Sequence, residues 1–121
     1  MTGPSQRQLR VGELIRRALS DILRGDLHDP DLDGVSITVG EVRASPDLKT
    51  ATAFVLPLGG TNAPAILAAL RRAKPEIRHA LARATDLRHV PDIRFEIDAT
   101  FDRLDDARRL FADAAVRRDV E

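Results

Sequence analysis

The feature that most constrains the fold of this chain is a proline inside a stretch with helical periodicity. Apolar residues recur at helical spacing on both sides of Pro75, from Ile66 to Leu81. Within a helix, proline removes one backbone hydrogen bond and clashes with an earlier carbonyl, at a cost of roughly 3 kcal/mol. At the start of a helix it is favoured. We therefore predict two helices, over 64–74 and 75–84, each opening with a proline.

The other elements follow from apolar spacing and turn residues. Gly40 interrupts the alternation of the first strand, as a β-bulge would. Residues 26–33 contain the turn dipeptides Asp-Pro and Asp-Gly and predict a loop. The predicted order is helix 6–24, strands 35–42 and 50–58 paired as a hairpin, the two helices at Pro75, strand 93–99 and a last helix over 103–118.

Length and composition limit the class of protein. A chain of 121 residues is long enough for one domain with a single core, which we place at about 7–115 within 1–121. The absence of cysteine excludes disulfides, zinc fingers and thiol nucleophiles. No apolar run approaches the roughly 20 residues of a membrane span, and the N-terminus lacks the apolar core of a signal peptide. These features predict a soluble intracellular protein without contact to a membrane.

The charges are segregated along the chain although the formal net charge is zero. Residues 1–25 carry a net charge of +3, and residues 26–33 carry −4 from four aspartates. Residues 71–94 hold seven cations against three acids, a net charge of +4. Seventeen of the nineteen cations are arginine, which a codon bias would explain. Codon bias does not explain their placement.

The sequence offers few groups for catalysis or metal binding. Its histidines, His28, His79 and His89, have no helical i, i+4 spacing, and the last two meet Asp86 only if the fold brings them together. The aspartates of 26–33 lack the spacing of a calcium loop and are expected to form a solvated loop after the first helix. We therefore expect no catalytic residue, no metal and no cofactor, and thus no enzyme.

The predicted break at Pro75 is a candidate anion site. The first amides of a new helix lack partners within that helix and carry the positive end of its dipole. Cations within one turn would suit a phosphodiester backbone. Two short helices with solubilising arginines explain the same residues equally well, so the residues alone leave both explanations open. The cations concerned are Arg71, Arg72, Lys74 and Arg78.

Four short motifs follow one another along nearly the whole chain. They are Arg10-Val11 with the first helix, Asp29-Pro30-Asp31-Leu32, Ser45-Pro46-Asp47-Leu48 between Val42 and Val55, and Leu87-Arg88-His89-Val90-Pro91 continuing to Phe95 and Asp98. In this order the motifs resemble the ribosome-binding factor A family of bacterial small-subunit assembly factors, over about residues 7–115. Asp31 departs from the family pattern, which has a basic residue at this position.

The resemblance implies an α+β fold: a type II KH-like domain of order α-β-β-α-kink-α-β with a C-terminal helix and helices on one face of a three-stranded sheet. KH domains clamp nucleic-acid backbone with a G-x-x-G loop. The family instead has Ala-x-Gly at the kink, and this chain replaces the glycine by Pro75, which lacks an N–H. Arg17 has a simpler alternative role, a pair with Glu13. The predicted RNA-binding residues are Arg71, Arg72, Ala73, Lys74, Pro75, Arg78, Arg83 and Arg88, with Arg10 and Arg17 as a flank.

The resemblance also implies a non-catalytic function. Members bind the immature small (30S) ribosomal subunit and its 16S rRNA as monomers in the cytoplasm, and assist maturation of the 5′ part of that RNA. They matter most in the cold, and an assembly GTPase helps to release them. The alternative is a protein–protein adaptor whose basic face meets an acidic partner, with incidental RNA contact. Sedimentation with purified subunits distinguishes the two.

Overall fold

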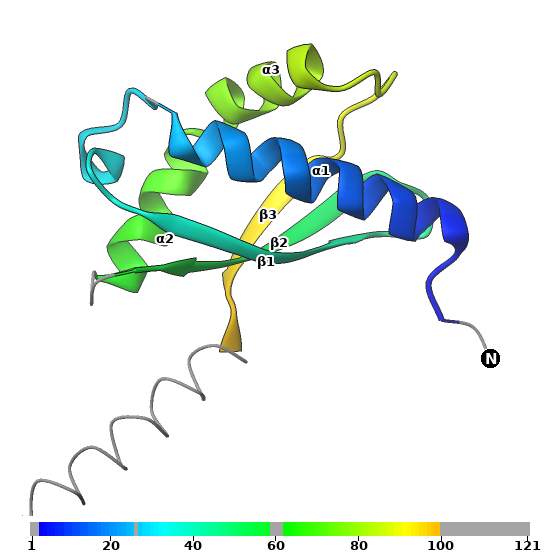
Figure 1. Ribbon diagram of the computed structural model, residues 1–121, viewed down its shortest axis with the longest axis horizontal. Coiled ribbons are helices and arrows are strands. Elements are labelled where there is room, and N and C mark those ends of the chain that lie inside the picture. The colour runs from blue at the N-terminus through cyan, green and yellow to red at the C-terminus, as the bar shows by residue number, and fades with distance from the viewer. Residues whose placement is uncertain (1–2, 26, 59–61, 100–121) are drawn as a thin grey trace, which may run out of the picture.

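The computed structural model describes residues 3–25, 27–58 and 62–99. Three helices and three strands follow one another in the predicted order (Figure 1). The predicted helix over 103–118 lies outside the described residues. The elements are α1 (Gln6–Arg24), a short 3-10 helix η1 (Pro30–Leu32), β1 (Ile37–Ala44), β2 (Thr50–Pro57), α2 (Ala63–Arg72), α3 (Lys74–Ala84) and β3 (Asp92–Ile97).

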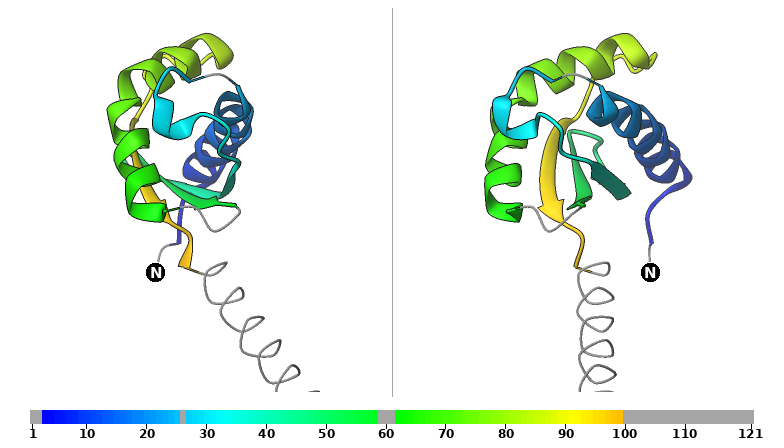
Figure 2. Two further views of the ribbon diagram at one scale, coloured as in Figure 1. Left: turned by 90° about the vertical axis from the view of Figure 1, so that its left-hand side faces the viewer. Right: turned by 60° about the vertical axis from the view of Figure 1, so that its left-hand side comes forward.

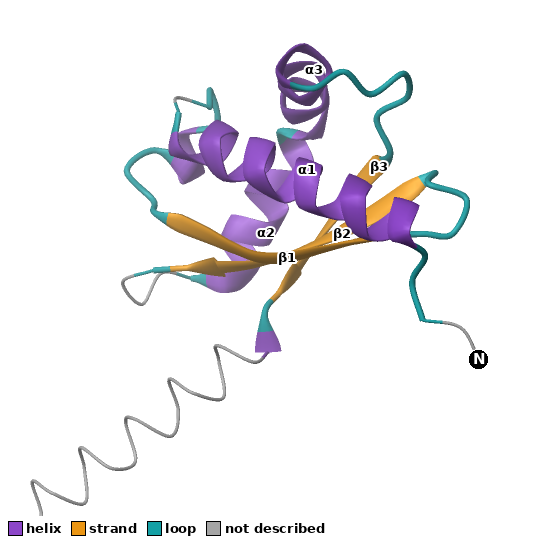
Figure 3. Cartoon of the chain, turned by 45° about the vertical axis from the view of Figure 1, so that its right-hand side comes forward, coloured by secondary structure: helices purple, strands orange, loops and turns teal. Residues whose placement is uncertain are grey.

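The strands form one mixed sheet in the order β1-β2-β3. β1 and β2 are antiparallel, which confirms the predicted hairpin, and β2 and β3 are parallel (Figure 3). Val39 pairs with Val55 and Glu41 with Phe54, so Gly40 is the extra residue of a bulge, as predicted. The bulge shifts the alternation of β1, and Val39 and Val42 both face the core.

The turn between β1 and β2 gives a physical reason for the Ser45-Pro46-Asp47-Leu48 motif. The Ser45 hydroxyl donates to the Asp47 carboxylate at 2.7 Å, and the Lys49 amide donates to the same oxygen at 3.1 Å. The Leu48 amide donates to the Ser45 carbonyl at 2.9 Å. The Ser45 hydroxyl also accepts from the Thr50 amide at 3.1 Å, so the side chains of Ser45 and Asp47 both supply acceptors that close the hairpin.

The helices cover one face of the sheet, consistent with the predicted KH-like α+β architecture (Figure 2). On that face the strands carry buried apolar residues, among them Val55 and Phe95. On the other face Thr38, Arg43 and Arg94 are exposed. α1 and α3 supply the largest fully buried helical side chains, Ile15, Leu19, Ile77 and Leu81, and α2 supplies Leu70.

The N-terminal half of α1 lies unusually close to β1. A Cβ atom built on Gly12 would lie 2.5 Å from the Val42 carbonyl oxygen, closer than side-chain carbons come to backbone oxygens in real structures. Four residues earlier, the Gln8 side-chain amide donates to the Ala44 carbonyl at 3.0 Å. Gly12 therefore permits a backbone approach that Gln8 helps to fix.

The predicted break of the helix is confirmed, with a shifted boundary. α2 ends at Arg72, and Lys74 belongs to α3 instead of ending α2, so Pro75 takes the second helical position. The missing N–H of proline is tolerated there because the first-turn amides have no acceptor within their own helix. Ala73 links the two helices, and its amide donates to the Ala69 carbonyl at 3.0 Å.

Candidate nucleic-acid interface

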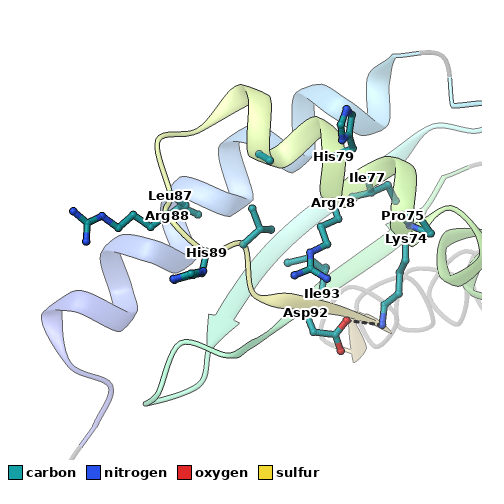
Figure 4. Close-up of a pocket in the computed structure, with 12 residues that line it drawn as sticks. Lys74, Pro75, Ile77, Arg78, His79, Leu87, Arg88, His89, Asp92 and Ile93 are labelled. Atoms are coloured by element: carbon teal, nitrogen blue, oxygen red, sulfur yellow. Dashed lines mark hydrogen bonds and ion pairs between the residues drawn. The ribbon is translucent and has the colours of Figure 1, made fainter.

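A cleft of about 560 Å³ lies between α3 and the loop that leads from α3 into β3. Its apolar lining includes Ile77, Leu87 and Ile93. Figure 4 shows Lys74 and Arg78 extending from α3 toward Asp92 at the start of β3. The charged or titratable side chains that line the cleft are Lys74, Arg78, His79, Arg88, His89 and Asp92.

The cleft has more cations than carboxylates. Lys74 Nζ lies 3.1 Å from Asp92 Oδ1, so this pair is formed within the chain. Arg78 and Arg88 are exposed and form no ion pair with any described residue. The cleft therefore offers two arginines whose donors are free to bind an anion from solution.

A second hollow, of about 220 Å³, adjoins the first at Lys74 and is lined by Arg71, Lys74, Arg94, Phe95 and Glu96. The Arg94 guanidinium lies 3.9 Å from Asp92 Oδ2, so Asp92 faces both Lys74 and Arg94. Arg71 is exposed and has no ion pair within the described part of the chain. We call the cations of the two hollows the basic surface: Arg71, Lys74, Arg78, Arg88 and Arg94.

The predicted set missed Arg94 and both cleft histidines. The alternation of β3 buries Ile93 and Phe95 and turns Arg94 outward, a signal that was available in the sequence. No sequence signal places Arg94 beside α2, because that neighbourhood depends on the packing of α2 on the sheet edge. His79 and His89, which the sequence suggested could meet only through the fold, both line the cleft.

Arg72 contacts the acidic loop, whereas its neighbour Arg71 lines the second hollow. Its Nε donates to Asp29 Oδ2 at 2.9 Å, and its Nη2 donates to Asp29 Oδ1 at 3.2 Å and to Asp31 Oδ2 at 2.8 Å. The hydrogen bond from Arg72 lowers the pKa of Asp29 below its ordinary value, with a further contribution from the Asp31 amide. The donors on Nε and Nη2 of Arg72 are thus occupied by carboxylates of the same chain.

A second contact ties the same loop to the start of α3. The His28 amide donates to Glu76 Oε1 at 3.1 Å, and the His28 ring Nδ1 contacts Glu76 Oε2. The hydrogen bond from the His28 ring lowers the pKa of Glu76, followed by the one from the His28 amide. We call these contacts the loop clasp; its residues are His28, Asp29, Asp31, Arg72 and Glu76.

The loop clasp corrects the expectation of a solvated acidic loop for Asp29, whereas Asp31 and Asp33 are exposed as expected. The Asp29 side chain is only 12% exposed, whereas that of Asp31 is 62% exposed. Asp29 also caps η1, since its carboxylate accepts from the Asp31 amide at 3.0 Å. The sequence did not reveal the clasp because Asp29 and Arg72 are 43 residues apart.

Of the other predicted residues, Pro75 lines the cleft, whereas Ala73, Arg83, Arg10 and Arg17 lie outside both hollows. Ala73 is buried, so its side chain cannot meet a ligand. Arg10 and Arg83 are exposed and have no ion pair with a described residue. Arg17 Nε lies 3.1 Å from Glu13 Oε1, which is the simpler role foreseen for it.

Glu13 also binds Arg16. The hydrogen bond from Arg16 and the weaker one from Arg17 lower the pKa of Glu13 to about 2. Within the described residues, no three histidines or carboxylates are grouped to hold a metal ion. No helix among them is long and apolar enough to cross a bilayer.

Comparison with known proteins decides the family. The family model described as ribosome-binding factor A matches residues 7–111. The chain belongs to the ribosome-binding factor A family. Ribosome-binding factor A of Paracoccus denitrificans is 67% identical over 121 residues, covering 99% of this chain and 88% of that protein. The protein of the same name from a Ruegeria species is 64% identical over 120 residues, covering 98% and 92%.

Solved structures of ribosome-binding factor A share the fold. The crystal structure from Thermus thermophilus is similar with a TM-score of 0.63 at 29% identity, covering 74% of this chain and 94% of that one. A solution structure from Thermotoga maritima, described as a putative member, gives 0.65 at 29% identity, covering 81% and 92%. A Thermus thermophilus RbfA model fitted into a cryo-EM map of a 30S–RbfA complex gives 0.58 at 30% identity, covering 70% and 88%.

Proposed function

We propose that this chain is a non-catalytic assembly factor that binds the immature small ribosomal subunit and its 16S rRNA in the cytoplasm. It assists maturation of the 5′ part of that RNA, matters most at low temperature, acts as a monomer and leaves with help from an assembly GTPase. Membership of the ribosome-binding factor A family supports this function, as does the similarity to RbfA fitted into a 30S complex.

The observation that carries RNA binding is the junction of the two hollows at Lys74. Five cations line the hollows against the carboxylates of Asp92 and Glu96. Arginine donors bind phosphate oxygens in pairs, and neutralised phosphates supply much of the affinity for nucleic acid. A ribose–phosphate backbone that follows the basic surface would therefore pass Arg88 and Arg78, cross Lys74, and reach Arg71 and Arg94.

Shape and backbone charge, more than base identity, would determine this recognition. The chain has four phenylalanines and no tyrosine or tryptophan, so it has few rings on which bases could stack. Contacts to phosphates position a protein without reading sequence. A net charge of zero would also limit the number of phosphates neutralised and favour release in cellular salt.

Sedimentation of the purified protein with purified small subunits, and separately with complete ribosomes, tests the proposal. We expect binding to the small subunit and weaker binding to complete ribosomes. Arg71→Ala combined with Lys74→Ala should weaken binding and lower the slope of log affinity against log salt by about 0.7 for each lost single-strand phosphate contact.

The control variant Arg7→Ala/Arg43→Ala removes two charges outside both hollows and should retain most of the binding. An equal loss in both variants would place the RNA elsewhere. No binding to either particle by the folded protein would favour the alternative, an adaptor whose basic face meets an acidic protein.

A further inference from the structure

The loop clasp, which has an excess of carboxylates, lies next to the basic surface, which consists of cations. Arg72 lies one residue from Arg71 and two from Lys74, both of which line the second hollow. The donors on Nε and Nη2 of its guanidinium are nevertheless occupied by the carboxylates of Asp29 and Asp31. A cation next to the proposed RNA path is thus paired with acids of its own chain.

The two carboxylates hold Arg72 in different ways. Asp29 accepts two hydrogen bonds from Arg72, is 12% exposed and also caps η1. Asp31 accepts one hydrogen bond, from Arg72 Nη2, and is 62% exposed. Exposed ion pairs contribute little net stability because water competes for both partners. Asp31 is therefore the partner that another anion could replace while Asp29 keeps the loop in place.

A phosphate is suited to replace a carboxylate at this position. Both groups are anionic and offer oxygen acceptors that match the planar fork of arginine. The Arg72 side chain is 52% exposed, so an anion in solution can approach it. A phosphate that reaches the exposed side of Arg72 would meet the donor on Nη2 that Asp31 now occupies.

We propose that Asp31 is an intramolecular competitor for RNA phosphate at Arg72, so that the acidic loop limits the affinity of the basic surface for RNA. This inference rests on the proposed function. Arg72 can then bind a phosphate only when Asp31 releases its donor on Nη2. A factor that must leave the subunit after maturation gains from such a limit, since each added phosphate contact strengthens binding and its dependence on salt.

A four-protein cycle tests the competition, with the binding of purified small subunits measured across salt concentrations. Asp31→Asn keeps the size of the side chain and removes its charge. It should raise affinity and increase the steepness of the log–log salt dependence by about 0.7, the value of one single-strand phosphate contact. Arg72→Ala alone should leave the slope unchanged, because its paired donors do not contact RNA. Asp31→Asn with Arg72→Ala should match Arg72→Ala, because the added contact requires Arg72. Asp31→Ser, with a shorter neutral side chain, should repeat the Asp31→Asn result.

Two outcomes would overturn the competition. If Asp31→Asn raises affinity equally with and without Arg72, the loop acts only through long-range repulsion. If Arg72→Ala alone weakens binding and lowers the slope, Arg72 already contacts RNA in the native protein. Both outcomes are read against the Arg71→Ala/Lys74→Ala variant, which must still weaken binding. If that variant binds like the native protein, it is the proposed function that fails.

Discussion

Arg71 and Arg72 are neighbours in sequence and lie in opposite electrostatic surroundings. Arg71 lines a hollow with Lys74 and Arg94 and has no ion pair within the described residues, whereas Arg72 binds two aspartates. Both counted equally in the +4 charge of residues 71–94. The difference shows that charge density along a sequence overstates the charge available to a ligand, because pairing across the fold removes part of it.

The largest effect that we expect is a loss of stability in Gly12→Ala, a substitution that changes no charge. In Gly12→Ala the new methyl group would lie 2.5 Å from the Val42 carbonyl oxygen, so α1 must move away from β1. Such overpacking costs about 1–3 kcal/mol, and each kcal/mol lowers the thermal midpoint by roughly 4 °C in a domain of this size. Thermal unfolding followed by circular dichroism measures the shift.

Gly12→Ala also serves as a control for the comparison of Arg71 with Arg72, because it lowers stability without removing a charge. At temperatures where the variant remains folded, the salt dependence of its RNA binding should equal that of the native protein, because no cation is lost. A change of about 4 °C per kcal/mol means that a midpoint within about 1 °C of the native value corresponds to almost no loss of stability. Such a result would show that α1 can move away from Val42 at little cost and that Gly12 is not required.

The next effect concerns the cations of the larger cleft. Arg78→Ala with Arg88→Ala removes two exposed arginines that have no ion pair with a described residue. If each contacts one phosphate, the log–log salt slope of small-subunit binding should fall by about 1.4. Arg7→Ala/Arg43→Ala, with the same change in net charge, should leave the slope close to the native value. A slope that stays native in the folded cleft variant would remove the cleft from the RNA path.

The sharpest comparison is between single substitutions at the two neighbours. Arg71→Ala should lower the slope by about 0.7, and Arg72→Ala should leave it unchanged, since its paired donors are not available to RNA. The two variants have the same net charge and adjacent positions, so long-range attraction is matched. Equal slopes in the two variants would show that pairing with the loop does not decide which cation meets RNA.

The contrast between Arg71 and Arg72 also shows which features of the molecule could not be predicted from the sequence. The break at Pro75, the hairpin and the bulge at Gly40 depend on neighbouring residues, and all three are confirmed. The contact of Gly12 with Val42 and the pairing of Arg72 with Asp29 join distant parts of the chain, and neither has a local signal. The sequence thus predicted the break and its cluster of cations, but could not show which cations are paired within the chain.

The smallest effect that we expect is a pH dependence of the loop clasp. The pKa values of Asp29 and Glu76 are lowered from ordinary values of 3.8 and 4.5 by hydrogen bonds from Arg72 and His28. A carboxylate whose pKa is lowered by folding stabilises the folded state above its unfolded pKa. That contribution is lost as the pH falls through the lowered value. The thermal midpoint should therefore decline below about pH 4.5, the ordinary value for Glu76.

Asp29→Asn/Glu76→Gln should lower the midpoint at pH 6 and make its decline in acid shallower than in the native protein. Asp33→Asn, an exposed neighbour in the same loop, should keep the native profile. Glu13→Gln should also lower the midpoint at pH 6 and should flatten the decline down to about pH 2, because the pKa of Glu13 is lowered from 4.5 to about 2. A decline that is equally steep without the two clasp carboxylates would show that the clasp adds nothing to stability. Arg72 would then be held by the loop only loosely, and the electrostatic distinction between it and Arg71 would have to rest on RNA binding alone.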